Sequence, residues 1–458
     1  MVKNRDSIVI TGAGFITPLG DSPEKIFHRM KSNECAAAPI VSHDCSTMPA
    51  SMGGAVDDSV IDSYKLDRIK FKLYNRYLKM GVIATANALQ DANLSFSSQN
   101  SSLSVDSALS GNSAAASDSL TYPEHRRGVF VSTGINGENA EGLFEAFKTS
   151  GDRNIDLRQY TCDGIGNVHP QWILASLSNN LIFFLTSEFN LRGDNNNTTY
   201  DPAGGFHMLG AAVRSLECGA CDIAVVTGTD SVLNWQAQDD LSKIGILQPC
   251  DGGPKNHRMA PFTSDARGAL PGEAACSLVL EKKSAALNRG ARILCEIRST
   301  SSHCTAWNSI LPNPDGSDTF FVLNELMRQI PPEAELVINL NGMGCPAWDN
   351  AERTGVRKAL KSLNNENSDV GRKVLCSTTK AWFCHTYSAS FILDTAITAM
   401  ALATDQLIPP HTAPDHDPDT DTEMLTFIDT FKSGMAEYAI CLGQGPGGNT
   451  GGVLLEKA

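Results

Sequence analysis

Short apolar segments that end in glycine alternate with helical stretches along the chain. Residues 7–15 (SIVITGAGF), 128–134 (GVFVSTG) and 222–228 (DIAVVTG) are rich in β-branched residues, and this pattern predicts buried strands that run into tight turns. Residues 74–92 and 206–219 carry apolar side chains at spacings of three and four, which predicts helices. This alternation favours an α/β fold in which helices cover a largely buried sheet.

The second half of the chain repeats the pattern. Strand-like segments occupy residues 291–297, 336–342 and 438–445, and residues 394–405 are expected to form a helix. The length of 458 residues exceeds that of one ordinary domain of roughly 100–200 residues. Glycine-ended strands in both halves therefore suggest an internal duplication.

Two segments interrupt the alternation. Residues 97–120 contain ten serines in 24 positions, a composition that buries little and predicts a surface insertion. Residues 409–424 carry alternating acids, which can ligate calcium. A calcium loop of the EF-hand type needs glycine at its sixth position, and counting from Asp415 that position is Thr420. We therefore expect a solvated acidic loop and no metal site.

The charge balance excludes some classes of partner. Lysine and arginine total 37 against 51 acidic residues, a formal charge of −14, which argues against nonspecific binding of nucleic acid or an anionic membrane. No apolar run reaches the ~18–20 residues that span a bilayer. Thirteen cysteines follow no spacing framework, and the N-terminus enters a strand at once, so we expect a reduced, cytoplasmic protein without a targeting peptide.

Several motifs of cofactor and metal sites are incomplete. The GAGF near residue 12 lacks the third glycine of a dinucleotide fingerprint, so we expect no nucleotide cofactor. Cys218 and Cys221 form a CxxC, but no second pair follows at zinc spacing. Cys384 and His385 are adjacent, and neighbours on a chain usually point apart, so adjacency is poor evidence for a catalytic pair.

Six ordered segments together carry a resemblance to a known family. They are residues 7–20 (SIVITGAGFITPLG), 190–231 (NLRGDNNN…GTDS), 261–281 (PFTSDARGALPGEAACSLVLE), 338–352 (INLNGMGCPAWDNAE), 377–386 (STTKAWFCHT) and 443–457 (GQGPGGNTGGVLLEK). The chain resembles, nearly from end to end, a β-ketoacyl synthase of the thiolase superfamily. The resemblance implies an α/β fold of two duplicated βαβαβ halves, residues 1–255 and 256–458, in a layered α/β/α/β/α body.

The resemblance also defines the site. In this family a cysteine at a helix N-terminus accepts the acyl chain, two histidines bind the malonyl thioester, and a lysine organises the site. Here Pro202 occupies the nucleophile position and Asn341 the first histidine position, whereas His385 and Lys380 are retained. The register around Asn341 is supported by Asp349 and Glu352, which keep their family spacing. No catalytic set is therefore intact.

A family member without its nucleophile resembles the chain-length factor of type II polyketide synthases, although the usual member carries glutamine where this chain has Pro202. Such a subunit pairs with an active ketosynthase and shapes the acyl tunnel in polyketide, polyene or fatty-acid-like synthesis. The resemblance implies that an acyl carrier protein docks mainly on the partner. Two alternatives remain open: a decarboxylase or acyltransferase that uses His385, Lys380 and Asn341, and a homodimeric acyl-binding scaffold.

The resemblance further implies which residues set tunnel length or meet the partner. Residues 131–147 match the family segment that contacts the partner, with Ile135 at the tunnel end and Leu143 and Phe144 just beyond it; ordinary interface packing explains these residues equally well. In the gating turn the family aromatic is replaced by Pro446, preceded by Gln444. Phe206 is a further tunnel or interface candidate, and Met208 and Leu209 are expected in the core.

Overall fold

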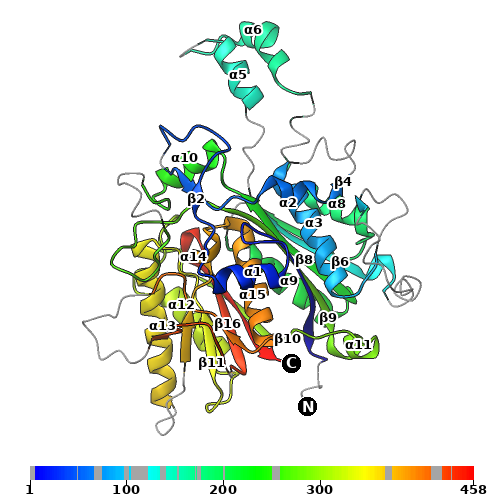
Figure 1. The fold of residues 1–458 in the computed structure, drawn as a ribbon, viewed down its shortest axis with the longest axis vertical. Helices are drawn as coiled ribbons and strands as arrows, with labels where there is room; N and C mark the ends of the chain where they lie inside the picture. Colours follow the sequence, from blue (N-terminus) through cyan, green and yellow to red (C-terminus); the bar gives the residue numbers. More distant parts are fainter. Residues whose placement is uncertain are drawn as a thin grey trace.

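The computed structural model describes residues 6–48, 50–66, 75–96, 103–104, 122–134, 141–151, 154–170, 172, 177–199, 202–249, 258–366, 374–413, 425–434 and 436–458. Its centre is an 11-stranded sheet (Figure 1). The strands run in the order β14 (Thr426–Phe427), β12 (Val374–Ser377), β11 (Leu336–Asn339), β16 (Tyr438–Gly445), β17 (Asn449–Lys457), β10 (Cys295–Cys304), β1 (Ile8–Ile16), β9 (Glu273–Lys282), β8 (Ile223–Ser231), β6 (Arg127–Thr133) and β7 (Asn195–Thr199).

The strand pairing repeats. In one unit β1 and β8 lie antiparallel to β9, and β6 continues parallel to β8 and β7. In the other, β10 and β16 lie antiparallel to β17, and β11 continues parallel to β16 and β12. An antiparallel pairing of β1 with β10 joins the two units. Division of the chain into duplicated halves remains a proposal; by strand pairing it would fall between β9 and β10.

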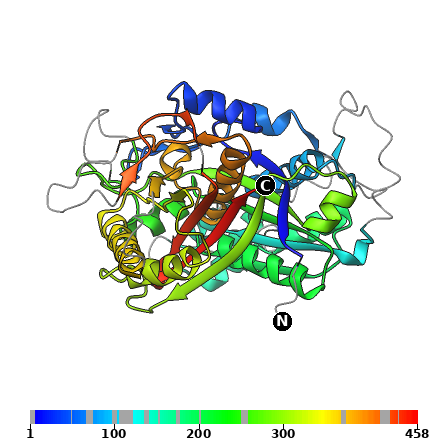
Figure 2. The same ribbon diagram turned by 90° about the horizontal axis from the view of Figure 1, so that it is seen from below.

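Helices form three layers around the two units of the sheet. The outer face of the first unit is covered by α3 (Arg76–Asp91) and α8 (Asn180–Phe189), and that of the second by α12 (Ser317–Met327) and α13 (Pro346–Glu366). Between the units lie α9 (Gly204–Cys218) and α15 (Ser390–Ala403), which contact strands of both. Figure 2 shows α15, in orange, at the centre of the body. This is the expected layered α/β fold.

Shorter elements complete the fold. Three two-stranded sheets pair β2 (Ala38–Pro39) with β3 (Met52–Gly53), β4 (Lys65–Leu66) with β5 (Leu103–Ser104), and β13 (Gln406–Leu407) with β15 (Lys432–Ser433). The remaining helices and turns are α1 (Pro23–Lys31), α2 (Asp58–Asp62), η3 (Glu124–Arg126), α5 (Glu141–Thr149), α6 (Leu157–Gln159), η4 (Tyr160–Gly164), η5 (Ile165–Asn167), α10 (Trp235–Lys243), α11 (Lys283–Asn288), α14 (Lys380–Phe383), η6 (Tyr387–Ala389) and η7 (Pro446–Gly448).

Most expected elements occur, with one shift. The strand expected over residues 291–297 is instead β10, which begins at Cys295 and runs to Cys304. Its second part, with the sequence STSSHC, pairs with β17 next to Gly451 and Gly452. Because these residues are polar, apolar alternation did not reveal them as a strand.

Two expected loops fall largely outside the described residues. Of the serine-rich segment 97–120, the structure describes Leu103 and Ser104, which form β5. Of the acidic segment 409–424, residues 414–424 lie outside the described part. Within the described ranges, no helix has both the length and the apolar character to cross a membrane.

The start of α9 is packed tightly between the two units. Its first residues are small, and the ring of Phe206 lies edge-on to Phe391 of α15 with centroids 5.6 Å apart. A Cβ added to Gly451 of β17 would lie 2.2 Å from the Phe206 ring, and one added to Gly443 of β16 would lie 2.6 Å from Phe391. Glycine at both positions is therefore required for the helix to approach the sheet.

Gly451→Ala tests this packing. The added methyl group must displace Phe206, so we expect the free energy of unfolding to fall by about 1–3 kcal/mol. Gly166→Ala is the matched control, because a Cβ there meets nothing within 4 Å. Denaturant unfolding measures both variants, and equal stabilities would contradict the packing described here.

Candidate functional site

The site residues that the resemblance assigns lie on three segments: the start of α9, the loop after β11 and the turn after α14. Pro202 is buried and directly precedes Ala203, the N-cap residue of this helix. The helix contacts η6, the turn that follows His385. Proline has no nucleophilic side chain and no backbone N–H, so this position offers neither an acyl acceptor nor a donor to an acyl oxygen.

Asn341 follows β11 and is held by a buried carboxylate. Its backbone N–H and that of Gly342 donate to Glu352 of α13, at 2.7 and 3.0 Å. Asp349 holds the same loop by accepting from the N–H groups of Gly344 and Phe262, at 3.1 and 3.0 Å. The family spacing of the two acids therefore fixes the backbone of the loop, whichever side chain stands at position 341.

Only the oxygen of the Asn341 side-chain amide is hydrogen-bonded within the described residues. Its Oδ1 accepts from the backbone N–H of Gln444 at 3.4 Å, whereas its buried Nδ2 has no hydrogen-bond partner among the described residues. Gln444 in turn donates from its side chain to Thr319 at 3.0 Å. The Asn341 amide is thus oriented, with an unused donor.

His385 is fixed as a neutral donor. Its backbone forms a β-bridge with Pro271, donating to the carbonyl of Leu270 and accepting from the N–H of Gly272. The ring Nδ1 accepts from the N–H of Tyr387 at 3.3 Å, so the proton of the neutral ring must sit on Nε2. Burial, helped by the charge of Lys380, holds the pKa of His385 well below its usual range.

The Nε2–H of His385 is buried and has no partner among the described residues. Together with the Asn341 amide it gives the site two unused donors, and it carries no positive charge at neutral pH.

Lys380 is buried in an ion pair. Its Nζ lies 3.0 Å from Asp394 of α15, which also accepts from the hydroxyl of Thr379 at 2.6 Å. Asn339 ties this group to β11 through hydrogen bonds of 3.0 Å to Thr379 and Thr398. The sequence indicated Lys380 but not its partner Asp394. The two residues are 14 positions apart and meet only because the chain turns between α14 and α15, which no local pattern records.

Cys384, which precedes His385, does not replace the missing nucleophile. Its backbone has φ 64°, and its side chain packs against Gly54 and Gly272. Burial raises the pKa of this thiol, which keeps it protonated and inert.

The residue predicted for the gating turn and the tunnel candidates differ in how far they are buried. Pro446 is half-buried in η7, and Phe206 belongs to the central core together with Met208 and Leu209. On α5, Leu143 is half-buried, and Phe144 is 49% exposed with its ring 5.9 Å from that of Trp235. Ile135 lies outside the described residues.

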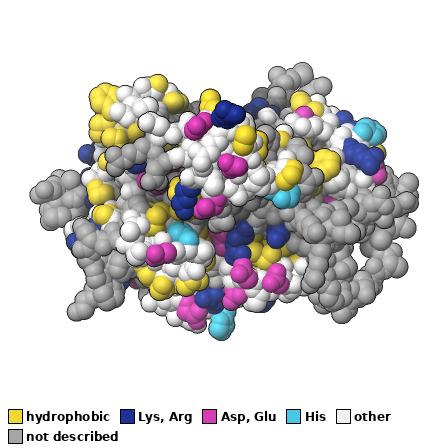
Figure 3. All heavy atoms as spheres, turned by 90° about the horizontal axis from the view of Figure 1, so that it is seen from above, with side chains coloured by type: hydrophobic (Ala, Val, Ile, Leu, Met, Phe, Trp, Pro, Cys, Tyr) yellow, Lys and Arg dark blue, Asp and Glu magenta, His cyan; other side chains and the backbone are white. Residues whose placement is uncertain are grey.

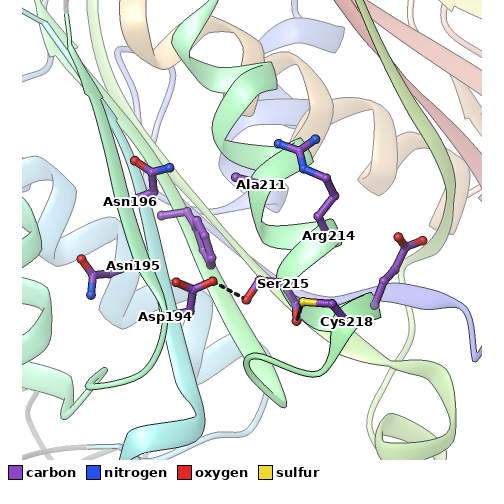
Figure 4. Close-up of a pocket in the computed structure, with 9 residues that line it drawn as sticks. Asp194, Asn195, Asn196, Ala211, Arg214, Ser215 and Cys218 are labelled. Carbon is purple, nitrogen blue, oxygen red and sulfur yellow. Dashed lines mark hydrogen bonds between the residues drawn. The ribbon is translucent and has the colours of Figure 1, made fainter.

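A separate groove of about 490 Å³ lies between β7 and α9 (Figure 4). Asp194 and Ser215 face each other across it and are joined by a 2.7 Å hydrogen bond. Its remaining lining residues are Phe130, Asn195, Asn196, Ala211, Arg214, Glu217 and Cys218. None of the candidate site residues lines it.

The described part of the chain holds no cluster of three or more histidine, cysteine, aspartate or glutamate side chains suited to a metal ion. At the positions that the resemblance assigns, the chain offers two neutral donors, one paired lysine and, at Pro202, no nucleophilic side chain.

Models of one protein family match most of the chain. The N-terminal domain of β-ketoacyl synthases matches residues 5–286, and the C-terminal domain matches residues 294–413. The 3-oxoacyl-[acyl-carrier-protein] synthase 2 of Vibrio cholerae is 24% identical over 463 residues, covering 100% of both chains. Nodulation protein E of Rhizobium leguminosarum bv. trifolii is 24% identical over 427 residues, covering 91% of each.

Solved structures share the fold. The ishigamide ketosynthase/chain length factor superposes with a TM-score of 0.76 at 19% identity, covering 99% of this chain and 100% of that one. A type II PKS ketosynthase complex with its acyl-carrier protein gives a TM-score of 0.77 at 17% identity, with the same coverage.

The buried acids predict a pH dependence of stability. Burial raises the pKa of Glu352 to about 7, against about 4.5 when unfolded. Between these values the unfolded chain has released a proton that the folded chain retains, so rising pH lowers the free energy of unfolding. Glu352→Gln should flatten this decline. Urea unfolding at about pH 5 and about pH 7 measures the change, and an undiminished decline in the variant would contradict the assignment.

Proposed function

The chain belongs to the β-ketoacyl synthase family, and we propose that it is a non-catalytic member that pairs with an active β-ketoacyl synthase and helps to set the length of the acyl product. The observation that carries this proposal is the buried start of α9, where Pro202 stands in place of a thiol. Condensation in this family proceeds through a covalent acyl-enzyme, and proline cannot form one.

The rest of the site supports a loss of chemistry with retention of structure. The Lys380–Asp394 pair and the Glu352 clamp on Asn341 are both fully formed. Asparagine at position 341 can donate a hydrogen bond but cannot shuttle a proton. Groups that shape the site are thus kept, while the two groups that would transfer the acyl chain and a proton are replaced.

One end of the molecule offers a surface for a partner subunit. The elements α5, α6, η4 and η5 stand off the body as an arm (Figure 1). More than half of the exposed large apolar side chains that the structure describes lie in the arm and the segment after it: Phe144, Phe147, Ile155, Leu157, Ile165, Leu177 and Phe183. Figure 3 looks down on this end and shows hydrophobic side chains gathered at its upper left. Apolar area of this kind is typical of a subunit interface.

The sheet supplies a second contact for such a subunit. Among the described residues β7 is the last strand on its side of the sheet, and its first two residues are exposed, so its outer edge can pair with a strand from a partner. The groove between β7 and α9 lies beside this edge and has Phe130 among its lining residues. Edge strand, groove and arm fit a partner of the same fold.

The proposed pathway is polyketide, polyene or fatty-acid-like synthesis on an acyl carrier protein. The relatives named 3-oxoacyl-[acyl-carrier-protein] synthase 2 and the solved ketosynthase/chain length factor support this range of substrates. The net charge of −14 would not attract an acidic carrier protein, so we place carrier docking mainly on the partner.

Phe144→Ala tests whether this chain limits the length of the acyl product. Removing the ring frees volume where the partner would meet α5, so the product of the reconstituted pair should be longer; Ile135→Ala should act in the same direction. Leu287→Ala, at a residue 60% exposed on α11, is the matched control and should leave the product unchanged. Mass spectrometry of the carrier-bound product measures length. Unchanged products in both test variants, with the complex intact, would contradict the assignment.

A second candidate function is favoured by one observation. The unused donors of Asn341 and His385 could bind a thioester carbonyl oxygen and stabilise the enolate that decarboxylation creates. Under this alternative the isolated protein releases carbon dioxide from a malonyl carrier thioester, and His385→Ala abolishes the release while His28→Ala, at an exposed residue of α1, does not. Absence of release from the unmodified protein would rule the alternative out.

A further inference from the structure

A thiol and an imidazole that the candidate site does not include lie together on the loop between β2 and β3. The Sγ of Cys45 lies 3.5 Å from Nε2 of His43, and it also donates weakly to the His43 carbonyl at 3.7 Å. Nδ1 of the same ring lies 3.0 Å from the hydroxyl of Ser42. Cys45 is half-buried and therefore reachable from solvent.

A buried amide from α10 completes the cluster. The Nε2 of Gln238 lies 3.2 Å from Nε2 of His43, although Gln238 is fully buried. The Oε1 of the same amide has no hydrogen-bond partner among the described residues. A buried acceptor without a partner requires an explanation, because leaving it unpaired costs about 1–3 kcal/mol.

A proton on Nε2 of His43 supplies that explanation. Rotation of the Gln238 amide by half a turn gives up the 3.4 Å donation from its Nε2 to the Leu233 carbonyl and brings Oε1 to the Nε2–H of His43, and amide orientation is not fixed by the heavy atoms alone. Transfer of the Cys45 proton to Nε2 puts this proton in place, while Nδ1 faces the Ser42 hydroxyl. The carboxylate of Asp44, beside His43 in the chain, adds negative charge to the environment of the ring.

We propose that Cys45 is an imidazole-activated thiol and a site of modification by thiol–disulfide exchange with low-molecular-weight disulfides. The thiolate of Cys45 attacks one sulfur of the disulfide, the S–S bond breaks, and a new bond forms to Cys45. The departing thiolate takes the proton from Nε2 of His43. The modified side chain would lie between the β2–β3 loop and α10. This chemistry is independent of the proposed function.

Oxidised glutathione and peptide mass spectrometry test the proposal on the full-length protein. The exposed thiols of Cys162 and Cys304 are the references within the same chain. Thiols paired with an imidazole ionise below the ~8.5 of a free cysteine. At pH 6 such a thiol is therefore thiolate to a larger fraction than a free cysteine, and the lower nucleophilicity of its thiolate offsets only part of this gain. Cys45 should therefore react several-fold faster than the references at pH 6, with a lower pH midpoint.

The variants decide whether His43 is responsible. His43→Asn should raise the pH midpoint of Cys45 to that of the references and remove its advantage at pH 6, and Cys45→Ser should remove the modified peptide. Gln238→Ala should shift the midpoint in the same direction as His43→Asn by a smaller amount. Unchanged reaction of Cys162 in each variant controls for the fold. A Cys45 midpoint equal to those of Cys162 and Cys304, or one unmoved by His43→Asn, would overturn the proposal.

Discussion

The close approach of α9 to the two units of the sheet is the constraint on which the rest of the structure depends. Glycine at positions 443 and 451 leaves room for Phe206 and Phe391, whose edge-on contact joins α9 to α15. This packing places Pro202 at the buried start of α9, and the side chain at position 202 takes no part in the contacts named above. The fold therefore does not depend on which side chain stands at position 202, because the residues that position the site are core residues of the body itself.

The polar groups of the site are also held in place by other parts of the fold. Glu352 and Asp349 hold the loop of Asn341 through its backbone, and Asp394 neutralises buried Lys380. The neutral ring of His385 needs no counter-ion, since its Nδ1 is satisfied by a backbone N–H. Lys380 is thus paired within the site, and the two acids accept hydrogen bonds from backbone N–H groups, so a substitution at position 202 or 341 removes neither kind of contact. A non-catalytic subunit can keep this geometry at little cost in stability.

Much of this arrangement could be predicted from the sequence, and the limits have physical causes. Glycine-ended apolar strands and helical spacing predicted the α/β layers, and ordered motifs placed Pro202, Asn341, Lys380 and His385 in one fold. The second part of β10 was missed because its residues are polar, and Asp394 was missed because the pairing depends on a turn. Phe206 stays a prediction as a tunnel or interface residue, and the sequence did not reveal that its ring packs in the central core on glycines of distant strands. Such contacts arise from tertiary packing, which local patterns do not record.

The central claim is that this chain acts through an active partner and not through a nucleophile of its own. The most direct measurement is co-expression of an active β-ketoacyl synthase and its acyl carrier protein with and without this chain, followed by mass spectrometry of the carrier-bound product. The account predicts that omission of the chain abolishes condensation or changes the length of the product. Condensation with the same product length in both cases would contradict it.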